Sequence, residues 1–442
     1  MWRTQRKAGL RFFSSAQLQT FIDTLLPLCL STTFASLDTH ITDGTPCDLQ
    51  AVFLELTTRL MGKMAYDMDM PSSLPFSHAF DYASGCVGER FQNPFWKINE
   101  WVFGGKMQKA VKEVKKFGDE IVLAAVQRRE AVLRSEVPKT DEHQHRNLID
   151  SLLDHIPSQR TVADAAMNYL SAGRDTTAQS LTWTFYLLMR NPRCIPSVLS
   201  ELSALRRGST APLPGSPGDS IPSYTALTAS PNPFTYTTAT FNEALRLYPP
   251  VPIELKECTS ATTFPDGTSL PAGAIVMWIP WAMNRSHHIW GVDADDYRPE
   301  RWLVSVDENE AKEAFTDDAK RNGNGGNKTS SLRRKETKTQ VVTRPAHEFP
   351  VFNGGARTCL GRRMAELLGV AVIAGVLREG YEFEEVETLD DAEGREREGR
   401  GKRIMEEKKS QSSLTLPMEG GLWVKIRKKE RNTEDEAKEQ RA

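Results

Sequence analysis

One segment constrains the fold more than any other: the apolar stretch from Thr161 to Arg190, which Asn191-Pro192 ends. About 30 residues in an α-helix span on the order of 45 Å, enough to cross a whole domain. Because apolar residues cover several of its faces, we expect this helix to be buried inside a larger, mainly helical structure. Thr161 is the predicted N-cap, with Asp164 as the acidic partner of a capping box.

The middle of this helix conflicts with the rest of it. Gly173 costs about 1 kcal/mol in a helix interior, and Asp175 and the two threonines after it are weak helix formers. A local conflict inside a strong element indicates a functional position. Asp175 and Thr176 are therefore candidate functional residues. The ordinary alternatives are a solvated position for Asp175 and, for Thr176, a hydrogen bond to the carbonyl one turn earlier.

Composition argues against several classes of protein. The 442 residues carry 56 Lys and Arg against 58 Asp and Glu, and a net charge of −2 argues against a nucleic-acid-binding protein. The six cysteines stand far apart without a C-x-x-C pair, which argues against a disulfide framework or a structural zinc site. The best apolar runs, Ala274–Met283 and Gly369–Leu377, fall short of the roughly 18 residues of a membrane span, and the first residues lack the apolar region of a signal peptide.

The chain divides into helical and polar parts. Residues 1–133 carry apolar side chains at helical spacing, and a further helix is predicted from about Thr237 to Leu247. Short strand-like pieces follow as far as about Met283, so the predicted fold class is mainly α with small β-sheets. We expect a single domain over residues 1–442. Polar, low-complexity or charged stretches interrupt or end it at 207–233, 305–345, 384–412 and 425–442.

A glycine-rich loop with one cysteine precedes an apolar helix that runs through Leu377. A Cys359 thiolate there lies near a helix N-terminus, whose N–H groups lower its pKa. The glycines allow close approach to a flat ligand, and Arg357 is placed to pair with a carboxylate at its edge. The alternatives are a buried small side chain, the default for the other cysteines, and a nucleophile, which no histidine context supports. The F-x-x-G-x-R-x-C-x-G spacing, too specific for the default, is formed by Phe352, Gly355, Arg357, Cys359 and Gly361.

This loop resembles the haem-binding loop of the cytochromes P-450, the haem-thiolate monooxygenases. Four other motifs of that family stand in the family's order: W-x-x-x-R at Trp2–Arg6, A/G-G-x-D/E-T-T/S at Ala172–Thr177, E-x-x-R at Glu243–Arg246 and P-E-R-F/W at Pro299–Trp302. E-x-x-R or W-x-x-x-R alone is common by chance, but five motifs in order are not. The resemblance therefore implies the cytochrome P-450 fold.

The resemblance also implies a role for each motif. Cys359 would ligate the iron of haem b as a thiolate, which pushes electron density onto the iron and favours O–O cleavage. Asp175 and Thr176 are similar to the acid–alcohol pair that delivers protons to dioxygen. A haem-thiolate isomerase or a peroxide-driven enzyme is an alternative that is disfavoured because this pair is intact.

Further residues are implied to support the haem and the core around it. Lys256 stands where the family usually has an arginine for a haem propionate, and lysine keeps the charge but loses the bidentate fork. Ala356 stands where the family usually has a proline, which slightly reduces loop rigidity. A buried Glu–Arg–Arg network is implied for Glu243, Arg246 and Arg301, against the alternative of a surface pair worth only tenths of a kcal/mol. The predicted cofactor-binding residues are Trp2, Arg6, Lys256, Phe352, Gly355, Arg357 and Gly361, of which Trp2, Arg6 and Arg357 resemble propionate partners.

The position of the W-x-x-x-R motif at Trp2 leads to two hypotheses. In the family a membrane anchor, a first sheet and several helices precede this motif, so we expect the chain to lack them. The first hypothesis is an active monooxygenase, because Cys359, Asp175 and Thr176 are all present. The second is a truncated, non-catalytic fragment with impaired haem binding, because the missing parts would leave apolar surface and sheet edges uncovered.

The residues that flank the motifs most resemble those of the fungal alkane and fatty-acid hydroxylases and their plant relatives. This resemblance implies hydroxylation of a long apolar chain. The implied partners are dioxygen, a hydrophobic substrate and an NADPH-cytochrome P-450 reductase, with Arg362 and Arg363 in its docking face or at an ordinary solvated helix start. The implied location is the cytosolic face of the endoplasmic reticulum membrane. The predicted pocket residues are Tyr169, Ala172, Val251, Pro252, Ile253 and the turn at Gly420-Gly421, and core packing is an equal alternative for each apolar one.

Overall fold

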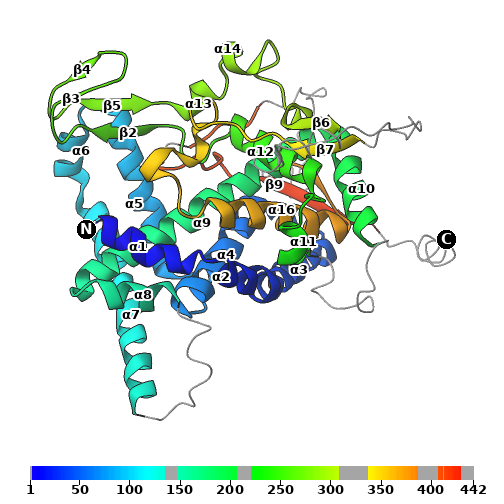
Figure 1. Ribbon diagram of the computed structural model, residues 1–442. Coiled ribbons are helices and arrows are strands. Elements are labelled where there is room, and N and C mark those ends of the chain that lie inside the picture. Colours follow the sequence, from blue (N-terminus) through cyan, green and yellow to red (C-terminus); the bar gives the residue numbers. More distant parts are fainter. Residues whose placement is uncertain are drawn as a thin grey trace, which may run out of the picture.

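The structure is a computed structural model that describes residues 2–134, 147–206, 221–307, 337–386, 407–411 and 413–429. It is mainly helical with small sheets, as predicted (Figure 1). The α-helices are α1 (Trp2–Phe12), α2 (Ser15–Thr20), α3 (Leu26–Asp43), α4 (Leu49–Met61), α5 (Pro75–Gln92), α6 (Trp96–Phe103), α7 (Gly105–Leu133), α8 (Leu148–His155), α9 (Gln159–Arg190), α10 (Ile195–Arg206), α11 (Tyr224–Leu227), α12 (Thr235–Leu247), α13 (Pro280–Met283), α14 (His287–Trp290) and α16 (Arg362–Arg378). The π-helical turns are η1 (Phe21–Leu25) and η2 (Gly62–Tyr66), and the 3₁₀ turns are η3 (Pro192–Cys194), η4 (Pro299–Trp302), η5 (Pro350–Phe352) and η6 (Gly355–Arg357).

The strands form small antiparallel sheets. They are β1 (Cys47–Asp48), β2 (Glu254–Glu257), β3 (Thr262–Thr263), β4 (Ser269–Leu270), β5 (Ile275–Trp278), β6 (Leu303–Asp307), β7 (Thr337–Val341), β8 (Tyr381–Glu385) and β9 (Trp423–Lys428). One sheet has the order β1-β9-β8, and the others are the pairs β2–β5, β3–β4 and β6–β7. In the β2–β5 pair Leu255 lies opposite Met277, so these two side chains share one face of the ribbon.

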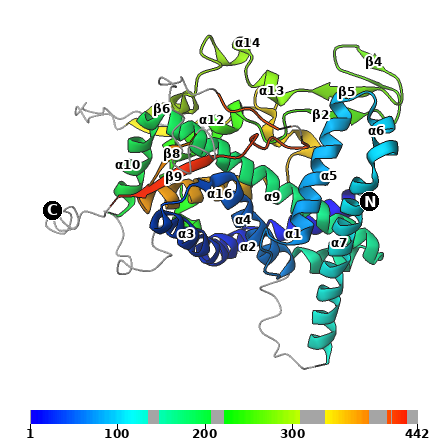
Figure 2. The ribbon, with the colours of Figure 1, turned by 180° about the vertical axis from the view of Figure 1, so that it is seen from behind.

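Helix α9 is the long helix predicted from the sequence, and it lies in the middle of the structure. Figures 1 and 2 show it with β2 and β5 above it and α2 and α3 below it. It packs against α4, α7, α12 and α16, and most of its side chains are buried. The predicted N-cap is wrong: Ser158 caps the helix by accepting the N–H of Thr161, whereas Asn191 ends it as predicted.

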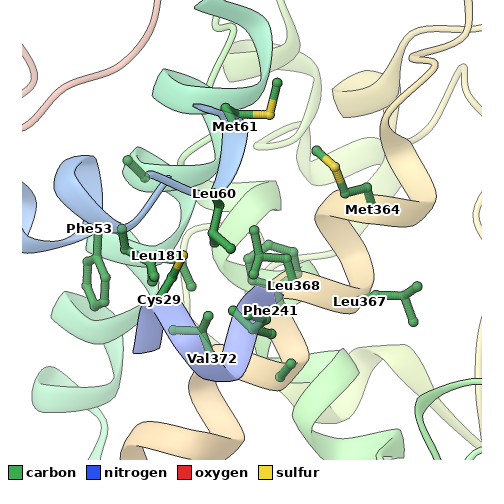
Figure 3. Close-up of a cluster of buried hydrophobic side chains, with 14 of the residues drawn as sticks. Cys29, Phe53, Leu60, Met61, Leu181, Phe241, Met364, Leu367, Leu368 and Val372 are labelled. Carbon is green, nitrogen blue, oxygen red and sulfur yellow. The ribbon is translucent and has the colours of Figure 1, made fainter. Parts of the chain in front are cut away.

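The core joins helices that are far apart in the sequence. Figure 3 shows side chains from α3, α4, α9, α12 and α16 pointing toward one another. Fully buried members of this cluster include Cys29, Leu60, Leu181, Phe241 and Leu368. Each large apolar side chain removed from water contributes about 1.5–3 kcal/mol, so this cluster fixes how α9 and α16 cross.

Two glycines allow the helices around α9 to approach closely. A Cβ atom on Gly173 would lie 2.5 Å from the sulfur of Met61, which explains the glycine that weakens the middle of α9. A Cβ atom on Gly369 would lie 2.5 Å from the ring of Phe241, so α16 also needs a glycine where it meets α12. Both glycines therefore serve packing, at the cost in helix propensity that the sequence indicates.

The prediction that no stretch is long and apolar enough to span a membrane is wrong. Among the described residues, the helical run Ser15–Asp43 meets that criterion by length and composition, with a mean hydropathy of 1.3 in a window that is 44% buried. The run consists of α2, η1 and α3, and its Ile22, Leu30 and Leu37 lie in the core. A buried core helix meets the same criterion, so the run by itself assigns no span.

Parts of the stretches predicted to be polar interruptions form helices or strands in the structure. Part of 207–233 is folded, because α11 lies in it and Tyr224 and Leu227 are buried. Strands β6 and β7 pair across the two ends of 305–345. Strands β8 and β9 take up the first residues of 384–412 and of 425–442. The remaining parts, 207–220, 308–336, 387–406, 412 and 430–442, lie outside the described residues.

Candidate active site

The loop before α16 holds Cys359 by backbone hydrogen bonds. The N–H of Cys359 donates to the carbonyl of Phe352 at 2.8 Å, and the N–H of Thr358 donates to the carbonyl of Gly355 at 3.1 Å. Gly355 has a φ of 60° in the left-handed region, where glycine avoids strain. Gly361 is the N-cap of α16, so Cys359 lies just before the positive end of that helix, as predicted.

Cys359 combines solvent exposure with a largely desolvated thiol. The residue is exposed, but the surrounding chain removes enough water that desolvation raises the pKa of the thiol. A hydrogen bond from the backbone of Gly361 and the positive charge of Arg6 oppose this rise. An added positive charge beside the sulfur would therefore be needed to hold it as a thiolate at neutral pH.

Helix α1 brings two predicted residues to this loop. The guanidinium carbon of Arg357 lies 3.7 Å from the centre of the Trp2 ring. The Nη1 of Arg6 donates to the carbonyl of Thr358 at 3.0 Å, and its guanidinium lies 5.8 Å from the same ring. The predicted residues Trp2, Arg6 and Arg357 thus form one cluster beside Cys359.

Lys256 is placed differently from these three residues. Its Nζ lies 4.9 Å from the centre of the Trp278 ring in the β2–β5 pair, and the residue is exposed. The strand itself is tied to the cysteine loop, because Asn353 Nδ2 donates to Glu254 Oε2 at 2.5 Å. Lys256 therefore lies on a strand bound to the loop without joining the Trp2 cluster.

Helix α9 keeps one open face although it is otherwise buried. Asp164, Asn168 and Ala172 are exposed and Thr176 is partly exposed, at the spacing of four residues that places them on one side of the helix. The hydroxyl of Thr176 donates to the carbonyl of Ala172 at 2.6 Å, which is the hydrogen bond weighed as its ordinary alternative. On a nearby face Tyr169 donates to the carbonyl of Gln5 at 2.9 Å and so links α9 to α1.

Asp175 is buried, which rules out the solvated position weighed for it. Its Oδ1 accepts from Arg174 Nη1 at 2.8 Å, and the same guanidinium pairs with Asp81 of α5. Desolvation raises the pKa of Asp175 to about 6, Arg174 opposes the rise, and the charge of Asp81 adds to it. The sequence reasoning missed Arg174 and Asp81. An arginine in the middle of an apolar helix is the signal by which Arg174 could have been found.

The predicted network around Glu243 is present in the core. Glu243 Oε1 accepts from Arg246 Nη2 and from Arg301 Nε, both at 2.8 Å, and Oε2 accepts from Trp302 Nε1 at 2.9 Å. Glu243 and Arg246 are fully buried, so the surface-pair alternative is wrong. The network holds the Pro299–Trp302 turn on α12.

The donor set fits a haem. An exposed cysteine stands at the end of a glycine loop, and a Cβ atom built on Gly355 meets nothing within 4 Å, so the loop is open at that point. Two arginines with an indole lie beside it, and arginine forks match carboxylates such as propionates. Thiolate is also a soft ligand that suits iron in haem.

A cavity of about 400 Å³ lies between α5, α7 and the first half of α9, where Asp164 and Asn168 of the open face line it. Its wall includes Phe80, Val111, Asp164 and Met167, and it contains none of the pocket residues predicted from the sequence. One predicted pocket element serves as a structural turn: a Cβ atom on Gly421 would lie 2.5 Å from the carboxylate of Asp48.

The other predicted pocket and docking residues occupy separate places. Val251 and Pro252 are partly buried before β2, and Ile253 is 48% exposed. At the start of α16, Arg362 pairs with Glu366 at 2.8 Å, and Arg363 donates to the hydroxyl of Tyr224 at 3.1 Å. Both arginines line a surface cavity of about 370 Å³.

Comparison with known proteins gives one family. The family described as "Cytochrome P450" matches residues 1–393. The chain is 30% identical to cytochrome P450 86B1 of Arabidopsis thaliana over 82% of this chain and 61% of that protein. It is 28% identical to cytochrome P450 94A1 of Vicia sativa, over 85% and 66% of the two chains, and to cytochrome P450 monooxygenase cyp1 of Mycosarcoma maydis, over 96% and 60%.

The chain thus spans 60–66% of the length of these three relatives. A crystal structure of a cytochrome P450, CYP102L1, has the same fold, with a TM-score of 0.64 over 97% of this chain and 79% of that chain at 17% identity. The five motifs, the fold and the match over most of the sequence agree. The chain belongs to the cytochrome P450 family.

Proposed function

We propose that the protein is a haem-thiolate monooxygenase that inserts one oxygen atom of dioxygen into a C–H bond of an apolar substrate. The observation that carries the proposal is the position of Cys359, which is exposed and lies beside the Arg6–Trp2–Arg357 cluster at the start of α16. In the balanced reaction, substrate, dioxygen, two electrons and two protons give the hydroxylated product and water.

The residues that would hold haem b follow from this geometry. Cys359 would ligate the haem iron as a thiolate, and Arg6 and Arg357 would pair with propionates while Trp2 orders the Arg357 guanidinium. Lys256 would add a positive charge from β2. When bound, the haem supplies the redox chemistry of dioxygen activation, with a thiolate that favours O–O cleavage.

Asp175 and Thr176 would supply the protons. Asp175 is buried, and its raised pKa of about 6 lets it exchange a proton near neutral pH. The Thr176 hydroxyl hydrogen now points to the Ala172 carbonyl, so a relay requires this hydrogen to turn away from that carbonyl. Because Ala172 is exposed on the same face, the hydroxyl has room to do so.

A long-chain fatty acid or alkane is the proposed substrate class. The support is the similarity of the motifs to the fungal and plant hydroxylases, together with the match to plant and fungal P450 relatives. The electrons would come from an NADPH-cytochrome P450 reductase, and the exposed Arg363 with Arg362 offers a basic surface for it. We place the protein at the cytosolic face of the endoplasmic reticulum membrane by the same resemblance.

A second candidate is a chain that binds haem poorly and has no activity. The observation in its favour is the apolar face of the β2–β5 pair, where Leu255, Ile275 and Met277 are 43%, 65% and 54% exposed. An uncovered apolar face on a sheet bound to the cysteine loop favours association of chains over a well-formed haem site.

The test of the proposed function is turnover with labelled dioxygen. The haem-loaded protein, an NADPH-cytochrome P450 reductase and NADPH are incubated with a panel of long-chain fatty acids and alkanes, and the products are analysed by mass spectrometry. A hydroxylated product with one labelled oxygen atom supports the proposal. Absence of labelled product from haem-loaded protein contradicts it.

A pair of variants on α9 sharpens this test. Thr176→Ala should let electron consumption continue while product formation falls, because the proton relay loses its hydroxyl. Ser180→Ala is the matched control, since Ser180 donates to the carbonyl of Thr176 one turn further on and has no proposed role. Equal product per electron in wild type and Thr176→Ala would contradict the relay.

A further inference from the structure

A buried guanidinium is shared by two carboxylates in the middle of α9. Arg174 Nη1 lies 2.7 Å from Asp81 Oδ1 and 2.8 Å from Asp175 Oδ1. Arg174 Nη2 donates to Asp81 Oδ2 at 3.3 Å, and Arg174 Nε donates to Thr58 Oγ1 at 3.0 Å. Asp81 therefore receives two N–H groups of this arginine, and Asp175 receives one.

The two carboxylates differ in their access to water. The side chain of Asp175 is 7% exposed and that of Arg174 is 2% exposed, whereas that of Asp81 is 49% exposed. One cation thus faces two anions, one of which is buried and has no other charged partner among the described residues that face it. The charged groups that act on Asp175 are Arg174 on its own helix and Asp81 from α5, and the neutral Thr58 of α4 holds the Nε of Arg174.

The sharing has a direct electrostatic consequence. A carboxylate next to an arginine is stabilised in its charged form, and a second carboxylate nearby opposes this. Asp81 disfavours the charged form of Asp175 in two ways. It repels the negative charge of Asp175, and it holds two N–H groups of Arg174, the only cation that faces Asp175 among the described residues.

We propose that Asp81 is a positioning residue for Asp175: it restrains Arg174 from fully pairing with Asp175 and so keeps the buried carboxyl able to take up and release a proton. Its catalytic meaning rests on the proposed function, in which Asp175 supplies protons. The half-exposed Asp81 carboxylate also brings this pair of charges into contact with water at the surface of α5. The position of α5 thereby controls an acid that lies on α9.

The experiment is an infrared pH titration of the intact, substrate-free protein. The protonated-carboxyl band that disappears in Asp175→Asn is assigned to Asp175, and its midpoint is followed in the other variants. Asp81→Asn should lower this midpoint by about one pH unit or more, because Arg174 then pairs with Asp175 alone. Asp81→Glu keeps the charge and the guanidinium contact and should restore the wild-type midpoint.

Glu89→Gln removes another exposed carboxylate from the same helix and is the matched control. A midpoint that stays the same or rises in Asp81→Asn overturns the inference, as does an equal shift in Glu89→Gln. Because Asp81 lies at the surface, its variants test the inference without removing the buried arginine. The titration follows the ionisation of Asp175 and not turnover, so it tests this inference separately from the proposed function. If the expected shifts occur but the protein has no hydroxylase activity, the inference is supported and the proposed function is contradicted.

Discussion

The guanidinium of Arg357 lies 3.7 Å from the centre of the Trp2 ring, which joins the first helix to the cysteine loop. A cation over an indole face is worth about 0.5–2 kcal/mol, so this contact fixes the direction of the arginine. Arg6 strengthens the link through its hydrogen bond to the Thr358 carbonyl. The site thus depends on a helix that is distant in sequence from Cys359.

The Trp2 contact predicts a loss of haem affinity in Trp2→Ala. Since the ring orders Arg357, its removal should weaken haem binding about 2- to 30-fold, the range that corresponds to the energy of a cation–π contact. Titration of the haem-free protein with haem measures the effect. Trp101→Ala is the control, because Trp101 is 87% exposed on α6. Equal affinities for wild type and Trp2→Ala would contradict a role of this ring at the haem edge.

The packing of α1 predicts a loss of stability in Gly9→Ala. A Cβ atom on Gly9 would clash with Tyr169 Oη and lie 2.6 Å from Leu360 Cδ2, so either these two side chains or α1 must move. We expect about 1–3 kcal/mol of lost unfolding free energy in urea. Gly105→Ala, where nothing lies within 4 Å, should leave stability unchanged or raise it. If the two variants are equally stable, the close approach of α1 is refuted.

The buried network around Glu243 predicts a large loss of unfolding free energy in Glu243→Gln. Arg246 and Arg301 would keep their charges without a carboxylate, and breaking a buried pair in this way costs about 3–5 kcal/mol. Glu382→Gln removes a carboxylate of an exposed pair with Lys429 and should cost about 1 kcal/mol or less. Equilibrium unfolding separates the two cases, and similar losses in both would show that the network is not the support of α12.

The raised pKa of Asp175 predicts that its contribution to the unfolding free energy falls as the pH rises. Its pKa is raised from 3.8 to about 6 in the folded state, so the folded protein binds the proton more tightly than the unfolded chain. This stabilisation is fully present below pH 4 and is lost as the pH rises through 6. The unfolding free energy of wild type relative to Asp175→Asn should therefore fall by on the order of 3 kcal/mol between about pH 4 and pH 7. A difference that stays flat or rises with pH would contradict the raised pKa.

Features that a short sequence motif determines could be predicted, and features that depend on packing between distant elements could not. The interior helix, the Cys359 loop and the Glu243 network could be predicted, because short motifs fix them. The Asp81 contact could not, since it depends on how α5 packs across α9. The N-cap prediction failed because Thr161 uses its N–H as a donor to Ser158, and not its side chain as a cap.

Two further differences have physical reasons. The length and apolar character of the Ser15–Asp43 run were not predicted, because Ser, Thr and Asp interrupt its apolar residues in the sequence. In the folded helix, Ile22 and Leu30 lie in the buried core. The pairing of β6 with β7 was hidden because the two strands flank a long polar segment, and a strand pair is set by contacts across such a segment.

The most direct test of the central claim is the reduced carbon-monoxide difference spectrum of the haem-loaded chain, compared with Cys359→Ser. Wild type should show the Soret band characteristic of thiolate-ligated haem, and Cys359→Ser should lose it. Cys258→Ser, which changes a cysteine outside the loop, should retain it. Failure of the wild-type chain to incorporate haem, or survival of the thiolate band in Cys359→Ser, would contradict the account.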